Sequence, residues 1–199
     1  MTAGFAFPKD TVAFLRELGQ NNAKTWFDAN RARYDAAYVE AGKGFVEAAA
    51  PLLETIAPGI SAEPRINGSI FRINRDIRFS KDKTPYKDHL DFWFWHGERK
   101  TAVSGLFARV APGGLTVGAG CHGFSREALP VYRAAIERSE AELRTAVDGL
   151  ERAGYVVSGS PGTPEDDHVP VGPRLAKCRA LFTVAEEPVA VAHDPKRLL

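Results

Sequence analysis

VSGLFARVAPGGLTVGAG, at residues 103–120, holds two segments rich in β-formers on either side of a turn sequence. Val103 to Val110 and Leu115 to Gly120 show the period-two pattern of strands, and APGG at residues 111–114 is typical of a tight turn. Two strands joined by so short a connection pair antiparallel. The stretch therefore predicts a β-hairpin within an antiparallel sheet.

Two segments before the hairpin also have strand character. Ile66 to Ile73 contains β-formers in alternation, and Phe92 to Trp95 places two aromatic rings on each face. Aromatic residues on both faces mean that the strand is covered on both sides, or that one face stacks on a ligand or partner. Gly118 and Gly120 remove side chains from one face of the hairpin, which permits close approach by another backbone or by a ligand. The residues alone leave both pairs of alternatives open.

Helical patterns lie on either side of these strands. Residues 8–58 show apolar residues at helical spacing, and Asn21 or Asn22 is placed to cap the second helix of this region. Pro51 falls inside the apolar pattern, which predicts a kinked helix or a new helix start there. A long helix is expected from residue 125 to residue 153, where Gly154 ends the pattern.

These patterns predict a single α+β domain over residues 1–199. Its parts are a helical region at 8–58, a sheet with a basic loop at 64–122, the helix at 125–153, and a tail of short strand, loop and strand at 155–199. Helices and sheet each have one apolar face, so they bury these faces against one another. The chain has neither alternating strands and helices nor a glycine-rich phosphate loop, which argues against a Rossmann or P-loop protein.

Composition indicates a cytoplasmic protein. The 199 residues carry a net charge of +1, 44% of them are hydrophobic, and no segment approaches the roughly 18 apolar residues of a membrane span. The first residues lack the basic and apolar regions of a signal peptide. Cys121 and Cys178 are too few for a disulfide scaffold. No cluster of ligand residues has the spacing of a metal site, so we predict neither a tightly bound metal nor a cofactor.

The most basic stretch is RINGSIFRINRDIRFSKDKTPYK, residues 65–87. It contains seven Arg or Lys and two Asp, a local charge of +5, whereas the rest of the chain has 19 positive and 23 negative side chains, a net charge of −4. Guanidinium groups suit a two-pronged grip on phosphate or carboxylate, and hydroxyl and ammonium groups add donors. We therefore expect an anion site in this stretch. Its predicted ligand-binding residues are Arg72, Arg75, Arg78, Ser80, Lys81, Lys83 and Lys87.

The leading hypothesis is a cleft for a small molecule that bears a phosphate or carboxylate, with or without catalysis. Candidate acids and bases are Asp76, Asp82, Tyr86 and His122, none with a partner identifiable from spacing. One alternative is a nucleic-acid or protein-partner module in which the same loop contacts phosphates and a tryptophan stacks on a base. A second alternative is a structural network in which the arginines pair with nearby aspartates.

Three segments together resemble a known family. They are FLRELGQNNAKTWFDANRARYD (residues 14–35), FRINRDIRFSKDKTPYKDH (71–89) and GLTVGAGCHGFSREALPVYRAAI (114–136). The long run from Arg75 to Lys83, followed by Pro-Tyr-Lys, is similar to the motif of the bacterial and fungal family called domain of unknown function 2461. The resemblance singles out the residues of this motif as the ones to test, and it implies no particular reaction.

Overall fold

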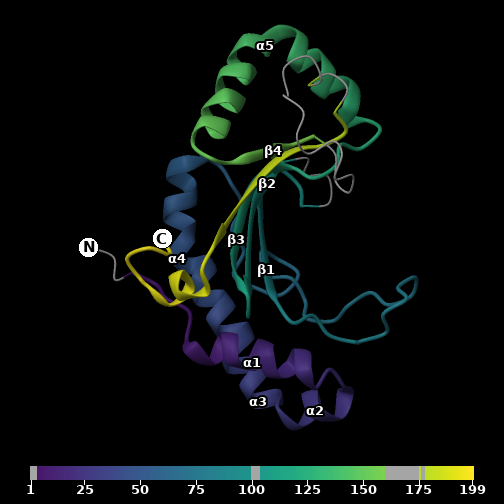
Figure 1. Ribbon diagram of the computed structural model, residues 1–199, viewed down its shortest axis with the longest axis vertical. Helices are drawn as coiled ribbons and strands as arrows, with labels where there is room; N and C mark the ends of the chain where they lie inside the picture. The colour runs from purple at the N-terminus through teal and green to yellow at the C-terminus, as the bar shows by residue number, and fades with distance from the viewer. Residues whose placement is uncertain (1–3, 100–103, 160–174, 176–177) are drawn as a thin grey trace. The chain divides into compact units, whose positions relative to one another are not determined.

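The computed structural model describes residues 4–99, 104–159, 175 and 178–199 (Figure 1). Its fold is α+β, as the sequence predicted. None of the helices in the described ranges is long and apolar enough to cross a membrane. The helices are α1 (Lys9–Gln20), α2 (Lys24–Ala29), α3 (Arg31–Tyr34), the π-helix η1 (Asp35–Glu40), α4 (Ala41–Ile56), α5 (Ala128–Arg152) and the 3₁₀-helix η3 (Val189–His193).

In the described part of the chain, the strands form one five-stranded antiparallel sheet in the order β1-β2-β3-β5-β4. The predicted hairpin is confirmed, since β2 ends and β3 begins on either side of the expected turn. At one edge of the sheet, Val157 of β4 is paired with Thr183 of β5. The strands are β1 (Leu90–Trp95), β2 (Gly105–Ala111), β3 (Gly114–Cys121), β4 (Val156–Ser158) and β5 (Leu181–Glu187).

Contacts along the chain group into two compact units. Unit 1 comprises residues 1–95, 107–116 and 186–199, and unit 2 comprises residues 96–106 and 117–185. Unit 1 therefore contains the N-terminal helices, β1 and the turn of the hairpin, together with the whole basic stretch. Unit 2 contains α5, β4 and most of β5.

The core of unit 1 forms where β1 packs on the helices. Phe92 of β1 is fully buried, and its ring centroid lies 4.6 Å from that of Phe45 on α4. Gly42 of α4 allows this approach, because a Cβ there would lie 3.2 Å from Ile70 and 3.6 Å from Phe92. Alternation along β1 then directs Asp91 and Trp93 to the opposite face of the strand.

The predicted strand at residues 66–73 is not formed. Asn67 has a left-handed φ of 63°, and its backbone N–H donates to Ile70 O at 2.8 Å, so this part of the chain makes a tight turn. A turn interrupts the extended geometry that a ladder needs. After the turn, residues 69–71 pair with β1. Trp93 N donates to Ser69 O at 2.9 Å, Ile70 forms a bridge with Phe92, and Phe71 N donates to Asp91 O at 3.0 Å.

The glycines of β3 serve backbone packing. A Cβ on Gly118 would lie 2.9 Å from Thr183 O, and a Cβ on Gly120 would lie 2.3 Å from Leu181 O. Both contacts are too short for any side chain, so β5 occupies the space that these glycines leave free. Of the two alternatives left open by the sequence, close approach by another backbone is the one realised.

The end of the chain joins the core of unit 1. Phe7 N donates to Ala192 O at 2.8 Å, and His193 Nδ1 donates to Phe7 O at the same distance. Val191 and Ala192 of η3 are buried. The last residues thus tie the N-terminal segment to the rest of unit 1.

Unit 2 has its own small core under α5. Ile136 and Val147 of the helix are buried with Val157 of β4 and Leu175. The helix departs from helical geometry at Ser139, where φ is −133°. The long helix predicted for residues 125–153 is therefore present, with an interruption near its middle.

Candidate functional site

The basic stretch forms a projecting arm, which we define as residues 75–85. The arm leaves the body of unit 1 as two antiparallel chain segments (Figure 1). Its base is closed by a bridge between Asn74 and Tyr86, by Arg75 N donating to Pro85 O at 2.9 Å, and by Lys87 N donating to Ile73 O at 2.8 Å. The two ends of the arm are therefore held together by backbone hydrogen bonds.

The base of the arm is attached to the helices by Asn22. Its Nδ2 donates to Tyr86 O at 2.9 Å, and Tyr86 N donates to Asn22 Oδ1 at 3.0 Å. The ring of Tyr86 is buried and stacks on Phe27 with centroids 4.3 Å apart. The predicted cap on α2 is wrong, since the N-cap is Ala23 and makes no side-chain bond. Asn22 satisfies the backbone of the arm instead.

Arg75 is engaged within the arm. Its guanidinium group bonds to the carboxylate of Asp82 and to the hydroxyl of Thr84. Asp82 also accepts the backbone N–H of Thr84 at 2.9 Å. Hydrogen bonds from the Thr84 backbone, from Arg75 and from the Thr84 hydroxyl lower the pKa of Asp82 to about 2. This arginine and this carboxylate satisfy each other.

Arg78 is engaged in the same way by the other carboxylate of the arm. Its Nε and Nη2 donate to Asp76 at 2.9 and 2.6 Å, and its backbone N–H adds a bond at 3.2 Å. The hydrogen bonds from Arg78 lower the pKa of Asp76. Lys83 Nζ donates to Ile77 O at 2.8 Å. Several of the predicted anion ligands are thus used to order the arm.

Three predicted ligand residues keep their donors available. Arg72, Ser80 and Lys81 make no side-chain hydrogen bond or ion pair with the residues that the structure describes. Beside them, Phe79 is 95% exposed. These residues can contact a ligand or partner without breaking an internal pair.

A second charged cluster lies at the start of β1, and we call it the Asp91 centre: Asp91 with Lys87, His89 and Arg109. The Asp91 side chain is only 6% exposed. Arg109 Nε donates to its Oδ1 at 2.6 Å, while Lys87 Nζ and His89 Nε2 each lie 3.3 Å from Oδ2. Burial alone would raise the pKa of Asp91, but hydrogen bonds from His89 and Arg109 hold it well below its ordinary value. Asp91 is a buried carboxylate anion.

His89 lies between two carboxylates. Its Nδ1 is 3.0 Å from Asp88 Oδ1, and its Nε2 is 3.3 Å from Asp91 Oδ2. Only the doubly protonated ring can donate to both, and the neutral ring must leave one contact without a proton. His89 therefore links an exposed carboxylate to a buried one.

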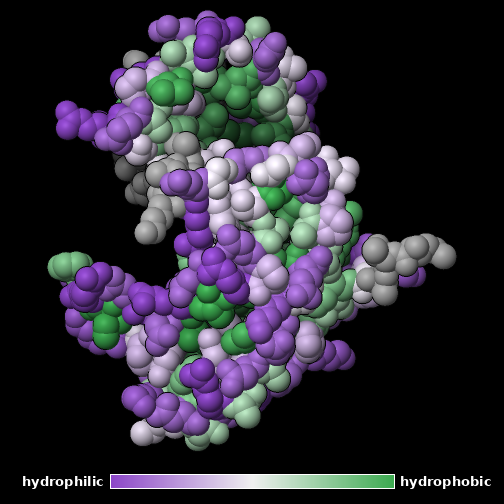
Figure 2. All heavy atoms as spheres, turned by 180° about the vertical axis from the view of Figure 1, so that it is seen from behind, coloured by the Kyte–Doolittle hydropathy of each residue, from purple (hydrophilic) through white to green (hydrophobic). Residues whose placement is uncertain are grey.

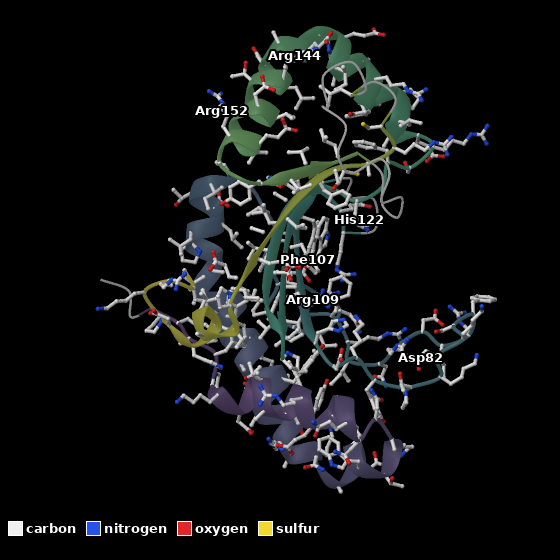
Figure 3. All side chains as sticks on the ribbon, in the orientation of Figure 1. Asp82, Phe107, Arg109, His122, Arg144 and Arg152 are labelled. Atoms are coloured by element: carbon white, nitrogen blue, oxygen red, sulfur yellow. The ribbon has the colours of Figure 1, made fainter. Side chains whose placement is uncertain are left out.

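Two aromatic rings border the cations of the centre. Lys87 Nζ lies 4.9 Å from the ring centroid of Phe71, and Arg109 Cζ lies 5.5 Å from that of Phe107. Figure 3 shows Phe107 and Arg109 along β2, whereas Asp82 lies out on the arm. The centre combines fixed cations, an acid–base group and apolar surface within unit 1.

Sequence reasoning identified Lys87 as a ligand residue and missed Arg109. The signal was present, because Asp91 and Arg109 are the only charged residues inside β1 and β2. A charge inside an apolar strand is costly unless it is paired, so two such charges on neighbouring strands indicate a pair.

The remaining predicted residues make contacts of their own. His122 is in unit 2 and packs edge-on against Phe182, with ring centroids 4.6 Å apart. Of the tryptophans considered for stacking, Trp95 is 2% exposed and Trp93 is half-buried. No group of three His, Cys, Asp or Glu side chains in the described ranges could hold a metal ion.

Comparison with known proteins identifies a family. The model of a family described as conserved hypothetical protein (DUF2461) matches residues 10–169 of the chain. No curated protein and no solved structure matches it. The matched range includes the arm and every residue of the Asp91 centre.

Proposed function

The chain belongs to the DUF2461 family of conserved hypothetical proteins, and we propose that it binds a small phosphate- or carboxylate-bearing molecule at the Asp91 centre. A location in the cytoplasm is part of this proposal, on the ground of its cysteine content. The observation that best supports anion binding concerns Arg109, because Asp91 pairs with one edge of its guanidinium group and leaves the other edge available.

A guanidinium group has two edges that can each grip an oxyanion. In Arg109 the edge of Nε and Nη2 faces Asp91, with Nη2 3.3 Å from Oδ2. Its Nη1 has no hydrogen-bond acceptor among the described residues, and the side chain is 40% exposed. The second edge is therefore available for an anion from solution.

Arg33, in the same unit, is an arginine whose two guanidinium edges are both paired within the protein. Its Nε and Nη2 donate to Asp10 at 2.6–3.0 Å, and its Nη1 and Nη2 donate to Glu17 at 2.6 and 3.0 Å. Both edges are filled by the protein. At Arg109 the described residues provide one carboxylate, that of Asp91, and a ligand anion would fill the other edge.

The charges around the centre also favour an anion. Lys87 and Arg109 are cations, and both contact the buried carboxylate of Asp91. Among the described residues Lys87 makes one ion pair, and it lies over the ring of Phe71, so N–H donors of its ammonium group remain unused there. Asp91 orients both cations, but its single negative charge cannot neutralise two positive charges.

His89 supplies the imidazole of this centre, and an imidazole ring can donate or accept a proton. It touches Asp91 directly, so it would lie beside a ligand held by Arg109. A bound phosphate ester or carboxylate would then have a proton donor or acceptor next to its charged group. This is the arrangement that an enzyme acting on such a ligand would need.

The test is direct binding of labelled inorganic phosphate by equilibrium dialysis, followed by sugar phosphates and small carboxylates up to about 10 mM. We expect binding to the wild-type chain and at least about tenfold weaker binding to Arg109→Gln, because the available edge is lost. Arg33→Gln is the matched control, since both edges of Arg33 are already filled. Equal binding by wild type and Arg109→Gln, or no binding of any of these anions to the wild type, would overturn the proposal.

A further inference from the structure

The two faces of β1 have different surroundings. Phe92 and Phe94 face α4, where their ring centroids lie 4.6 and 6.4 Å from that of Phe45. Alternation along the strand puts Asp91 and Trp93 together on the other face. One aromatic face of β1 is therefore covered by a helix. The sequence left open whether the other is covered as well or stacks on a ligand.

The neighbouring strand β2 extends the face that holds Asp91. Phe107 and Arg109 alternate with buried residues of β2 and are themselves half-buried. The two strands are antiparallel, and Arg109 meets Asp91 across them. Trp93 follows Asp91 on β1 in the same direction in which Phe107 follows Arg109 on β2. Two aromatic side chains thus lie next to the Asp91–Arg109 pair on one face of the sheet.

The indole ring of Trp93 is half-buried and has no partner among the described residues. Its backbone N–H donates to Ser69 O at 2.9 Å. In the same part of the chain its Nε1 makes no hydrogen bond, and the ring forms no stacked, edge-on or cation–π pair. A planar ligand ring can therefore stack on it, and Nε1 can donate to a nitrogen or oxygen of that ring.

The available edge of Arg109 lies close to these rings. Its Cζ is 5.5 Å from the ring centroid of Phe107, and its Nη1 has no acceptor among the described residues. An anion bound at Nη1 would therefore lie beside an aromatic surface. The distance is short enough for the anion and a stacked ring to belong to one small molecule.

We propose that the ligand of the Asp91 centre carries a planar aromatic ring, which stacks on Trp93 beside Phe107 while its phosphate or carboxylate binds Arg109. Nucleoside monophosphates and aromatic acids both have this chemistry. The inference rests on the proposed function, since it takes the anion site at Arg109 as its starting point.

The arm offers a less suitable place for such a ring. Phe79 is 95% exposed, and Figure 2 shows the arm as a mostly hydrophilic projection. A ligand ring stacked on Phe79 would keep most of its surface in water, so little apolar area would be buried. Trp93 and Phe107 are half-buried, so the surface around them covers more of a bound ring.

The test compares pairs of ligands that differ mainly by the ring. Adenosine monophosphate is compared with ribose phosphate, and phenylacetate with acetate, by equilibrium dialysis against the full chain. We expect the ring-bearing member of at least one pair to bind at least about fivefold more tightly than its partner, because stacking adds to the anion contact. The pair with the larger difference distinguishes a nucleotide from an aromatic acid.

Substitutions at the rings test where the added affinity arises. Trp93→Leu and Phe107→Leu should each reduce the preference for the ring-bearing ligand to less than about twofold, and Trp93→Phe should retain most of it. Arg109→Gln should weaken both members of a pair. Phe79→Leu is the matched control, since it removes an exposed aromatic ring of the same unit. Circular dichroism establishes that each variant is folded.

Three outcomes would overturn the inference. They are equal binding of both members of each pair, a preference that folded Trp93→Leu and Phe107→Leu variants retain, and tighter binding of a short oligonucleotide with a steep dependence on salt. Equal binding that Arg109→Gln still weakens would leave the proposed function standing. If none of these anions binds the wild type, the proposed function fails, and this inference fails with it.

Discussion

Arg109 holds the buried carboxylate of Asp91 by one edge of its guanidinium group, with Nε 2.6 Å from Oδ1 and Nη2 3.3 Å from Oδ2. The two residues come from neighbouring strands, 18 positions apart in the chain. Their pairing allows an apolar strand to carry a charge, and it points the rest of the arginine away from the carboxylate. Stability and the proposed anion binding would thus depend on the same contact.

Replacing Asp91 by Asn should destabilise unit 1. The change leaves Arg109, Lys87 and His89 without the anion that they share. Loss of one partner of a buried ion pair is strongly destabilising. Because the Arg109 side chain is partly exposed to solvent, the effect is reduced, and we expect a loss of about 2 kcal/mol in the free energy of unfolding. Urea denaturation measures it.

Glu140→Gln is the control for that measurement. Glu140 pairs with Arg144 on the surface of α5, and such exposed pairs contribute less than about 0.5 kcal/mol. An Asp91→Asn variant as stable as this control would show that the Asp91 centre contributes nothing to folding.

The Asp91 centre should also make stability depend on pH in the acid range. The pKa of Asp91 is lower in the folded chain than the value of about 3.9 for an unfolded one. The ionised form therefore favours folding: its contribution is present above about pH 4 and is lost as the pH falls through the folded pKa. We expect the wild type to lose more unfolding free energy than Asp91→Asn between about pH 6 and about pH 2.5. Parallel pH profiles for the two proteins would contradict this expectation.

Asn22→Ala should loosen the base of the arm without unfolding the chain. The substitution removes both bonds to the backbone of Tyr86, at a cost of about 1–2 kcal/mol. Hydrogen exchange at the Tyr86 amide should become faster. Asn21→Ala is the neighbouring control, because the side chain of Asn21 donates to Glu17 O within its own helix end. Equal exchange rates in the two variants would mean that Asn22 does not hold the arm.

Arg75→Met should disorder the arm while leaving the core intact. Arg75 crosses the arm to Asp82 and Thr84 and is 27% exposed, whereas Arg78 pairs with Asp76 two residues away and is 76% exposed. We therefore expect faster hydrogen exchange across residues 76–84 in Arg75→Met than in Arg78→Met. The free energy of unfolding should change by less than about 1 kcal/mol in both, because the arm lies outside the core. Unchanged exchange in Arg75→Met would show that the backbone alone orders the arm.

Local sequence patterns were sufficient to predict much of the fold. The turn at residues 111–114 fixed the hairpin, and α4 follows the apolar spacing that surrounds Pro51. The prediction of a strand at residues 66–73 was wrong, because Asn67 adopts a left-handed φ and makes a turn there. The alternation of β-forming residues in this segment gave no sign of that turn. The ion pair of Arg78 with Asp76 is likewise local, two residues apart, and was among the pairings considered from sequence.

By itself, the sequence determined the α+β class, the hairpin and the position of the basic stretch, because each depends on residues a few positions apart. Tertiary structure decided which cations remain available to a ligand. Arg109 meets Asp91 across 18 residues, and Asn22 meets Tyr86 across 64. Such contacts depend on how strands pair and helices pack, and a buried carboxylate orients its cations only once water has been excluded around it.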